Sequence, residues 1–153
     1  MLCAAALACA ATADAPLEPM TVCEVLRDLP SQEGKSVAVF GRYSFRATGR
    51  WVAEQSCSPA IGAPPQLWLV EDLKDAPHPP ADFEIDGAAL RRKFADMVKH
   101  TALGKFRFGT PDYDRWAVVY GRVEQRKGED AKKAPANLVI RGSGVIVFVA
   151  PEQ

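Results

Sequence analysis

Basic and aromatic residues alternate around one predicted hairpin, in residues 36–57. The candidate ligand-binding residues are Arg42, Tyr43, Arg46, Arg50 and Trp51, together with Arg122 at the equivalent place on a later strand. Aromatic side chains stack on the bases of single-stranded nucleic acids, while basic side chains contact the phosphates. In the alternative interpretation, Tyr43, Phe45 and Trp51 belong to the core and the arginines are charges at its rim. The balance of 19 Lys and Arg against 19 Asp and Glu favours this alternative.

Four other places hold residue types that occur in catalytic or metal sites. They are His78 in a Pro-rich loop, His100 with Asp96 four residues before it, the pair Asp112 and Asp114, and Ser143 between two glycines. Loops that bind hard cations need more carboxylates at regular spacing, and a nucleophile elbow needs a full G-x-S-x-G run between strand and helix. Neither histidine has partner ligands near it in sequence. We therefore expect no enzyme, no metal site and no cofactor, and a hydrolase is the least favoured function.

The first fifteen residues, MLCAAALACAATADA, are almost wholly small and apolar and end in an A-x-A pattern. They are too short to span a bilayer, so we interpret residues 1–15 as a signal peptide that export removes. No Lys or Arg precedes the apolar run, which keeps a non-secreted N-terminus as an alternative. Residues 6–9 loosely resemble a lipoprotein box, so lipid anchoring at Cys9 is a minority interpretation. We expect a periplasmic or extracellular protein.

Removal of this leader takes away Cys3 and Cys9 and leaves Cys23 and Cys57. An even pair of cysteines in an exported chain most simply forms one disulfide. The loop between them spans 57 − 23 = 34 residues, for which chain entropy suggests a stabilisation of about 3–4 kcal/mol. A metal pair or a reactive thiol is the alternative, but no histidine lies near either cysteine in sequence.

Five strands and two helices are predicted to carry these residues. The first strand begins at Ser36 and contains a glycine at 41, and the second runs from a turn at 48–49 to Cys57. The third covers residues 66–70, the fourth 116–125 and the fifth 136–149, which Gly142 and Gly144 interrupt. Gly41 and Gly121 are expected to mark a bulge or sharp bend where the sheet curls. The third strand is continuously apolar and is expected to be buried on both faces or to lie near the barrel centre. The segments 71–86 and 126–135 are predicted to be surface loops.

The two predicted helices differ in length. A short one over residues 22–28 begins with a capping box, in which Thr21 and Glu24 each satisfy a backbone N–H, and is ended by Pro30. The longer one over residues 87–101 has Asp86 as N-cap and an apolar stripe. That stripe consists of Leu90, Phe94, Met97 and Val98, and we expect it to plug one end of a barrel.

Several parts of the sequence together resemble a group of uncharacterised exported bacterial proteins. These parts are TVCEVL at 21–26, EGKSVAVFG at 33–41, Cys57 and LWL at 67–69. The run GK-x-V-x-V-x-G is also similar to the first strand of OB-fold domains. The resemblance implies a mainly β, five-stranded OB-like curled sheet or barrel, with a short N-terminal helix and one longer helix between strands three and four. It brings no activity, and the glycines at 142 and 144 leave closure of the barrel open.

The chain is thus expected to hold a spacer over 16–20 and one OB-like domain over 21–150. The predicted function is a small exported binding or interaction module without catalysis, whose partner is a protein or an envelope component. An acidic segment at 71–86 next to a basic one at 91–107 would steer a charged partner at zero net charge. In the alternative interpretation, the two segments are solvated faces without a function. The alternative is a single-stranded nucleic acid or oligosaccharide binder that uses the barrel face.

Overall fold

The strands of this chain form one sheet that closes on itself. The computed structural model describes residues 16–80, 84–100, 113–141 and 146–148, with the backbone alone at 98–100, 113, 114 and 146–148. Five strands make a barrel: β2 (Ser36–Arg46), β3 (Gly49–Ala53), β4 (Gln66–Glu71), β5 (Tyr113–Gln125) and β6 (Ala136–Ile140). Each of them lies where the sequence places a strand, because β-branched and aromatic residues recur in these segments.

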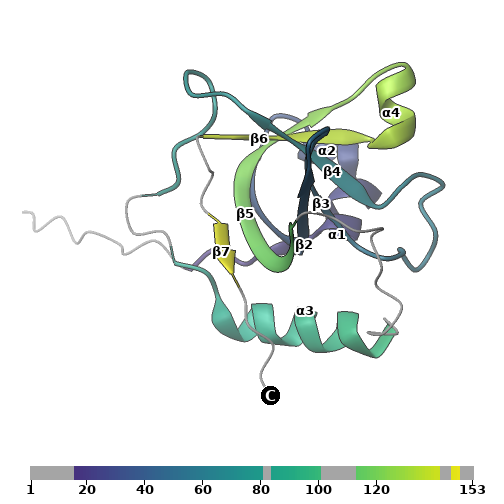
Figure 1. Cartoon of the computed structure of the whole chain (residues 1–153). Coiled ribbons are helices and arrows are strands. Elements are labelled where there is room, and N and C mark those ends of the chain that lie inside the picture. The colour runs from purple at the N-terminus through teal and green to yellow at the C-terminus, as the bar shows by residue number, and fades with distance from the viewer. Residues whose placement is uncertain (1–15, 81–83, 101–112, 142–145, 149–153) are drawn as a thin grey trace, which may run out of the picture.

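The barrel closes because β5 pairs with both β6 and β2, in the order β2-β3-β4-β6-β5-β2 (Figure 1). The β4–β6 pair is parallel and the other four neighbouring pairs are antiparallel. This order, with a longer helix between the third and fourth barrel strands, is OB-like, as the sequence predicts. The sequence leaves closure of the barrel open. The continuous β2–β5 ladder, from Ser36↔Arg122 to Phe45↔Tyr113, shows that the barrel is closed.

Gly41 and Gly121 allow neighbouring strands to approach closely. A Cβ atom at Gly41 would lie 2.9 Å from the carbonyl oxygen of Ala53, and one at Gly121 would lie 2.6 Å from that of Val139. The β2–β5 register runs through both glycines without an extra residue, so the predicted bulge is absent from this ladder. The glycines curl the barrel by removing side chains rather than by breaking the pairing.

The barrel interior is filled by alternate residues of the strands and by the first helix. Val39, Val52, Leu67, Val119 and Leu138 are each 0% exposed and pack in one cluster. Helix α1 (Val22–Arg27) adds Val22, Val25 and Leu26 to that cluster. The predicted capping box is present at its start. Helix α1 therefore fills part of the barrel interior, a role that the sequence predicts for the longer helix.

The longer helix, α3 (Gly87–His100), packs on the outside of the barrel. The carboxylate of Asp86 accepts hydrogen bonds from the backbone N–H groups of Ala88 and Ala89, which confirms the predicted N-cap. Leu90, Phe94 and Met97 contact a second cluster on the outer faces of β2 and β5, formed by Ala38, Phe40, Trp116, Val118 and Tyr120. The prediction that α3 plugs the barrel end is wrong, because the residues it contacts alternate with the interior ones.

Both ends of the described chain join the sheet. Leu17 pairs with Ile85, and Pro19 is fully buried, so residues 16–20 pack on the domain. The two-residue strand β1 (Met20–Thr21) pairs in parallel with β2, and β7 (Ile146–Phe148) pairs with β5. The fifth predicted strand is therefore divided between β6 and β7, and the glycines at 142 and 144 lie outside the described residues.

Further predictions are wrong in detail. Pro30 does not end the helical region, because it lies in the first turn of α2 (Leu29–Gln32), where a proline needs no N–H. Strand β3 ends at Ala53 instead of Cys57. The charged segment after β5 contains a short helix, α4 (Glu129–Lys133). Strand β4 is buried on one face only, and Val70 on its outer face is 37% exposed.

Candidate functional site

The predicted basic and aromatic group does not form one surface. Tyr43 points into the barrel and is 7% exposed, whereas its neighbour Arg42 lies on the outer face, with its guanidinium 5.0 Å from the ring centroid of Trp116. Trp51 is also on an outer face and is 9% exposed, while Arg46 is exposed near the hairpin turn. Successive side chains of a strand point to opposite faces, which separates Tyr43 from Arg42 and Trp51.

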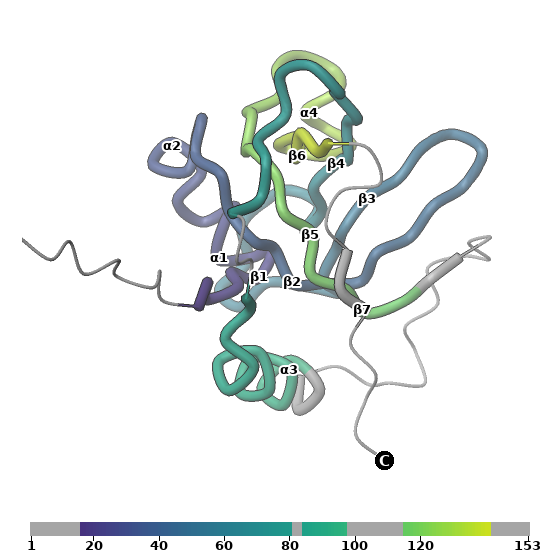
Figure 2. Tube along the Cα trace, turned by 90° about the vertical axis from the view of Figure 1, so that its left-hand side faces the viewer, coloured from purple at the N-terminus to yellow at the C-terminus, as the bar shows by residue number. Residues whose placement is uncertain are grey.

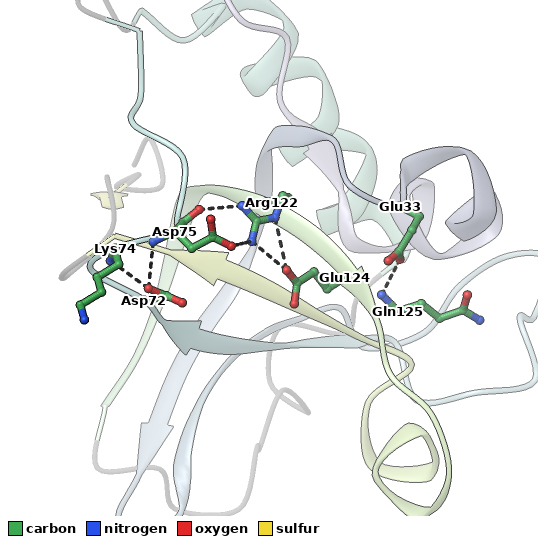
Figure 3. Close-up of polar contacts among 7 residues, drawn as sticks. All are labelled: Glu33, Asp72, Lys74, Asp75, Arg122, Glu124 and Gln125. Carbon is green, nitrogen blue, oxygen red and sulfur yellow. Dashed lines mark hydrogen bonds and ion pairs between the residues drawn. The ribbon is translucent and has the colours of Figure 1, made fainter.

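The remaining two arginines are tied to carboxylates. Arg50 forms an ion pair with Glu71 of β4 at 2.9 Å. Arg122 lies on β5, where it bonds Glu124 at 2.8 Å and Asp75 at 3.0 Å and also donates to the backbone carbonyl of Asp75 (Figure 3). The bond to Glu124 and the charge of Asp75 raise the pKa of the Arg122 guanidinium.

Arg122 belongs to a group of hydrogen-bonded residues that holds the segment after β4 in place. The Asp72 carboxylate accepts hydrogen bonds from the backbone N–H groups of Lys74 and Asp75, and these bonds lower its pKa (Figure 3). Asp75 is thereby held where Arg122 reaches it. Glu33 accepts a hydrogen bond from the backbone N–H of Gln125 on the same strand as Arg122. The geometry gives Arg122 a structural role in the described structure.

A pocket that the sequence did not reveal lies between the β2–β3 turn and α4. Its volume is about 390 Å³, and we call it the Trp68 pocket after its aromatic member. It is lined by Thr48, Trp68, Arg126, Asp130 and Lys133. These residues come from the turn after the first barrel strand, from the third strand and from the connection between the last two barrel strands. Ligands of OB-folds commonly bind on this side of the barrel.

Trp68 is held by a stack of aromatic rings and by a glycine. Its indole lies 5.7 Å from that of Trp51, with the two planes 15° apart. Trp51 and Trp68 are register partners in β3 and β4, so they share a face, and this face is the outer one because the neighbouring partners Val52 and Leu67 lie in the interior. Gly49 lies beneath the indole, since a Cβ atom there would be 2.3 Å from Trp68. The outward position of Trp68 also explains why an apolar strand is buried on only one face.

Arg126 forms the basic wall of the Trp68 pocket. Its guanidinium lies 5.7 Å from the Trp68 ring centroid and 3.4 Å from Asp130, and its side chain is 13% exposed. The Nη1 atom is buried and has no hydrogen-bond partner within the described part of the chain. The side-chain amide of Gln66 donates to the carbonyl of Lys133, which fastens α4 to β4. The pocket is thus preformed, with two basic residues and one acidic residue around an indole.

A second concave surface lies beside the disulfide. The predicted bond between Cys23 and Cys57 is present, with the two Cα atoms 5.5 Å apart. It borders a cleft of about 250 Å³ between α1, residues 54–58 and α3, which we call the disulfide cleft. Its charged lining residues are Glu24, Arg27, Glu54, Lys93 and Asp96.

Glu54 is the perturbed group of the disulfide cleft. Its carboxylate accepts a hydrogen bond of 2.8 Å from the backbone N–H of Cys23. Burial raises the pKa of Glu54 above the ordinary glutamate value, against the lowering effect of hydrogen bonds from Cys23 and Thr21. Lys93 bonds Glu24 at 2.7 Å and reaches Glu18 at 3.5 Å. Nothing in the sequence around Glu54 signals this arrangement, which depends on the disulfide and on α3.

Of the other residues singled out in the sequence, the structure describes the side chains of two. His78 is exposed in its loop, as is Asp96 on α3. The side chains of His100 and Asp114, and the residues Asp112 and Ser143, lie outside the described residues. Across the described ranges, no group of three or more His, Cys, Asp or Glu side chains is arranged to hold a metal ion.

Comparison of the chain with protein-family models, curated proteins and solved structures found no match. Among the helices of the described residues, none combines the length and apolar character needed to cross a bilayer.

Proposed function

We propose that this protein is a small exported binding module without catalytic activity, which captures a protein or envelope component at the Trp68 pocket. The observation that carries the proposal is the position of Trp68 between two fixed loops, with Arg126 and Lys133 beside its ring. Loops on a rigid barrel suit recognition, because little conformational freedom is lost on binding. The apolar leader of the sequence and the Cys23–Cys57 disulfide support export.

The polar groups of the pocket favour a ligand with both apolar and hydrogen-bonding parts. An indole offers a flat apolar surface, and Arg126 has five N–H donors in a planar fork. Its Nη1 donor, for which the described residues provide no acceptor, gains a partner when a carbonyl, carboxylate or hydroxyl oxygen enters after a small side-chain movement. A peptide segment or a sugar of the cell envelope carries such oxygens next to apolar surface.

A single-stranded nucleic acid is the second candidate ligand, because Trp68 would stack on a base while Arg126 and Lys133 contact phosphates. The outward Trp51–Trp68 stack is the observation that favours it. Against it, Asp130 lines the same pocket and the chain has no net charge. The two candidates differ in salt dependence, since phosphate contacts release counterions.

Binding of a cell-envelope fraction and of a labelled single strand distinguishes these candidates. We expect the envelope fraction to retain the wild-type protein, and the double variant Arg126→Gln, Lys133→Gln to be retained at least tenfold less. Lys127→Gln is the matched control, because Lys127 is exposed on the same connection and does not line the pocket. Micromolar binding of the single strand that weakens steeply with salt, and that the double variant loses, would replace the envelope partner with a nucleic acid.

A further inference from the structure

The disulfide cleft has walls that are fixed to one another. The Cys23–Cys57 bond joins α1 to residues 54–58, and Arg27 donates to the backbone carbonyl of Ser58 across the same boundary. Lys93 joins α3 to α1 through both carboxylate oxygens of Glu24, at 2.7 and 2.9 Å. A cleft held on three sides is preformed, so a ligand that enters it does not have to order the surrounding chain.

The charges within the cleft are unevenly compensated. Glu24 has a cationic partner in Lys93, which also reaches Glu18 at 3.5 Å. Glu54 receives a hydrogen bond from the backbone of Cys23 but forms no ion pair with any residue that the structure describes. Arg27 is directed to the carbonyl of Ser58. A half-buried carboxylate without an ion-pair partner is costly to ionise, even with the charge of Arg27 nearby, and a cation that pairs with it lowers that cost.

We propose that the disulfide cleft is a second binding site, which takes a primary ammonium group beside Glu54. An ammonium group has three donors and no acceptor, so it complements the acceptor sites that Glu54 keeps beside its hydrogen bonds from the Cys23 N–H and the Thr21 side chain. Met97 in the lining offers an apolar surface for the alkyl chain of such a ligand. A volume of about 250 Å³ accommodates a short alkylamine or a lysine side chain. This site is separate from the Trp68 pocket.

The charged groups around Glu54 predict how binding depends on pH. Glu24 faces it from α1 with negative charge and Arg27 with positive charge, while Lys93 and Asp96 face the cleft from α3. An ammonium group binds the ionised form of Glu54 better, so binding releases a proton where Glu54 is still protonated in the free protein. The affinity therefore falls by up to about tenfold for each pH unit below the pKa of Glu54.

The test is an NMR titration of the full chain with n-butylammonium, and n-butanol is the neutral control of the same shape. We expect a saturable shift of the Cys23 amide signal with the amine and none with the alcohol, because this amide donates to Glu54. We also expect the affinity to decrease as the pH falls through the pKa of Glu54. Equal shifts with the alcohol, no saturable shift, or a pH-independent affinity would overturn the proposal.

Two variants and a second probe complete the experiment. Glu54→Gln keeps an acceptor for the Cys23 N–H and should lose at least tenfold in affinity, while Arg126→Gln in the Trp68 pocket should leave amine binding unchanged. Unaltered binding by Glu54→Gln would contradict the assignment. An Nα-acetyl-lysine methylamide that binds more tightly than n-butylammonium assigns the site to a lysine of a polypeptide, and the reverse order assigns it to a free amine.

Discussion

The guanidinium group of Arg126 lies over the indole ring of Trp68, 5.7 Å from its centroid. Trp68 lies in strand β4 and Arg126 in the connection after β5, and they meet because Trp68 points outward from β4 while Arg126 directly follows β5. A cation over an indole face is attracted by the ring quadrupole. This contact defines the pocket on which the proposed binding function rests.

Replacement of Gly49 by Ala should destabilise the protein by about 1–3 kcal/mol. Gly49 has a φ of +145°, and a Cβ atom there would lie 2.3 Å from the Trp68 ring. Gly34→Ala is the matched control, since Gly34 has a φ of +77° and a Cβ atom there would have no neighbouring atom within 4 Å. Urea unfolding should therefore show a larger loss at position 49. Equal losses would mean that the Trp68 ring does not rest on the hairpin backbone.

Removal of the disulfide by the double variant Cys23→Ser, Cys57→Ser should lower the free energy of unfolding by about 3–4 kcal/mol, as expected for a closed loop with a separation of 34 residues. Urea unfolding of the oxidised and the double-variant proteins measures this difference. Mass spectrometry without reductant should find neither cysteine alkylated in the wild-type protein. Two alkylated thiols at these positions would contradict the bond.

Phe94→Ala should cost about 3 kcal/mol, the lower end of the range for a buried phenylalanine, because the side chain is only partly buried. Its ring packs against those of Phe40 and Trp116, with ring centroids 6.1 Å and 5.3 Å away, and so holds α3 on the outer barrel face. Arg91→Ala on the exposed side of the same helix should change stability by less than about 0.5 kcal/mol. Similar thermal shifts in the two variants would show that α3 is not packed on the barrel.

Glu54 should make stability fall as the pH rises. Its pKa is raised in the folded protein, so between the ordinary glutamate pKa and the raised one the folded state holds more protons than the unfolded state. Stability from this group is fully present at low pH and is lost across that window. The unfolding free energy of the wild-type protein relative to Glu54→Gln should therefore decrease with pH. An increase across the same window would contradict the assigned direction.

The Asp86 carboxyl provides the opposite case in the same chain. Hydrogen bonds from the backbone N–H groups of Ala89 and Ala88 lower its pKa. NMR titration of the side-chain carboxyl carbons should show Asp86 titrating below the ordinary aspartate range and Glu54 above the ordinary glutamate range. Ordinary values for both groups would mean that neither environment persists in solution.

The strands, the disulfide and the start of both predicted helices could be predicted from local patterns. A run such as Val37–Phe40 is rich in β-branched and aromatic residues, and the Thr21–Glu24 capping box needs only two residues at fixed spacing. The location of α3 could not be predicted, because its stripe fits either the barrel end or an outer face. The outer faces of β2 and β5 carry Phe40 and Trp116, whose apolar character conceals which side is the interior.

The candidate site was harder to predict than the fold. Arg42 and Tyr43 are adjacent in a strand and so cannot share a face, which the alternation of β2 already implies. Leu67 and Leu69 flank Trp68, which makes a core position the natural interpretation, and only the pairing of β4 with β3 brings Trp68 onto Trp51. Arg126 lies in a charged segment that contains α4, and a hydrogen bond from Gln66 of β4 to the Lys133 carbonyl joins that helix to the sheet. Long-range pairing, which local sequence does not encode, creates this pocket.

Site-specific photo-crosslinking tests the proposed binding surface most directly. Benzoylphenylalanine is placed at Thr48, which lines the Trp68 pocket, and at Arg91, which is exposed on α3 at the opposite side of the barrel from α4 (Figure 1 and Figure 2). In a cell-envelope fraction, we predict a discrete crosslinked product from position 48 that the Arg126→Gln, Lys133→Gln background abolishes, and none from position 91. Crosslinking that is equal at the two positions, or that persists in the double-variant background, would contradict the proposal.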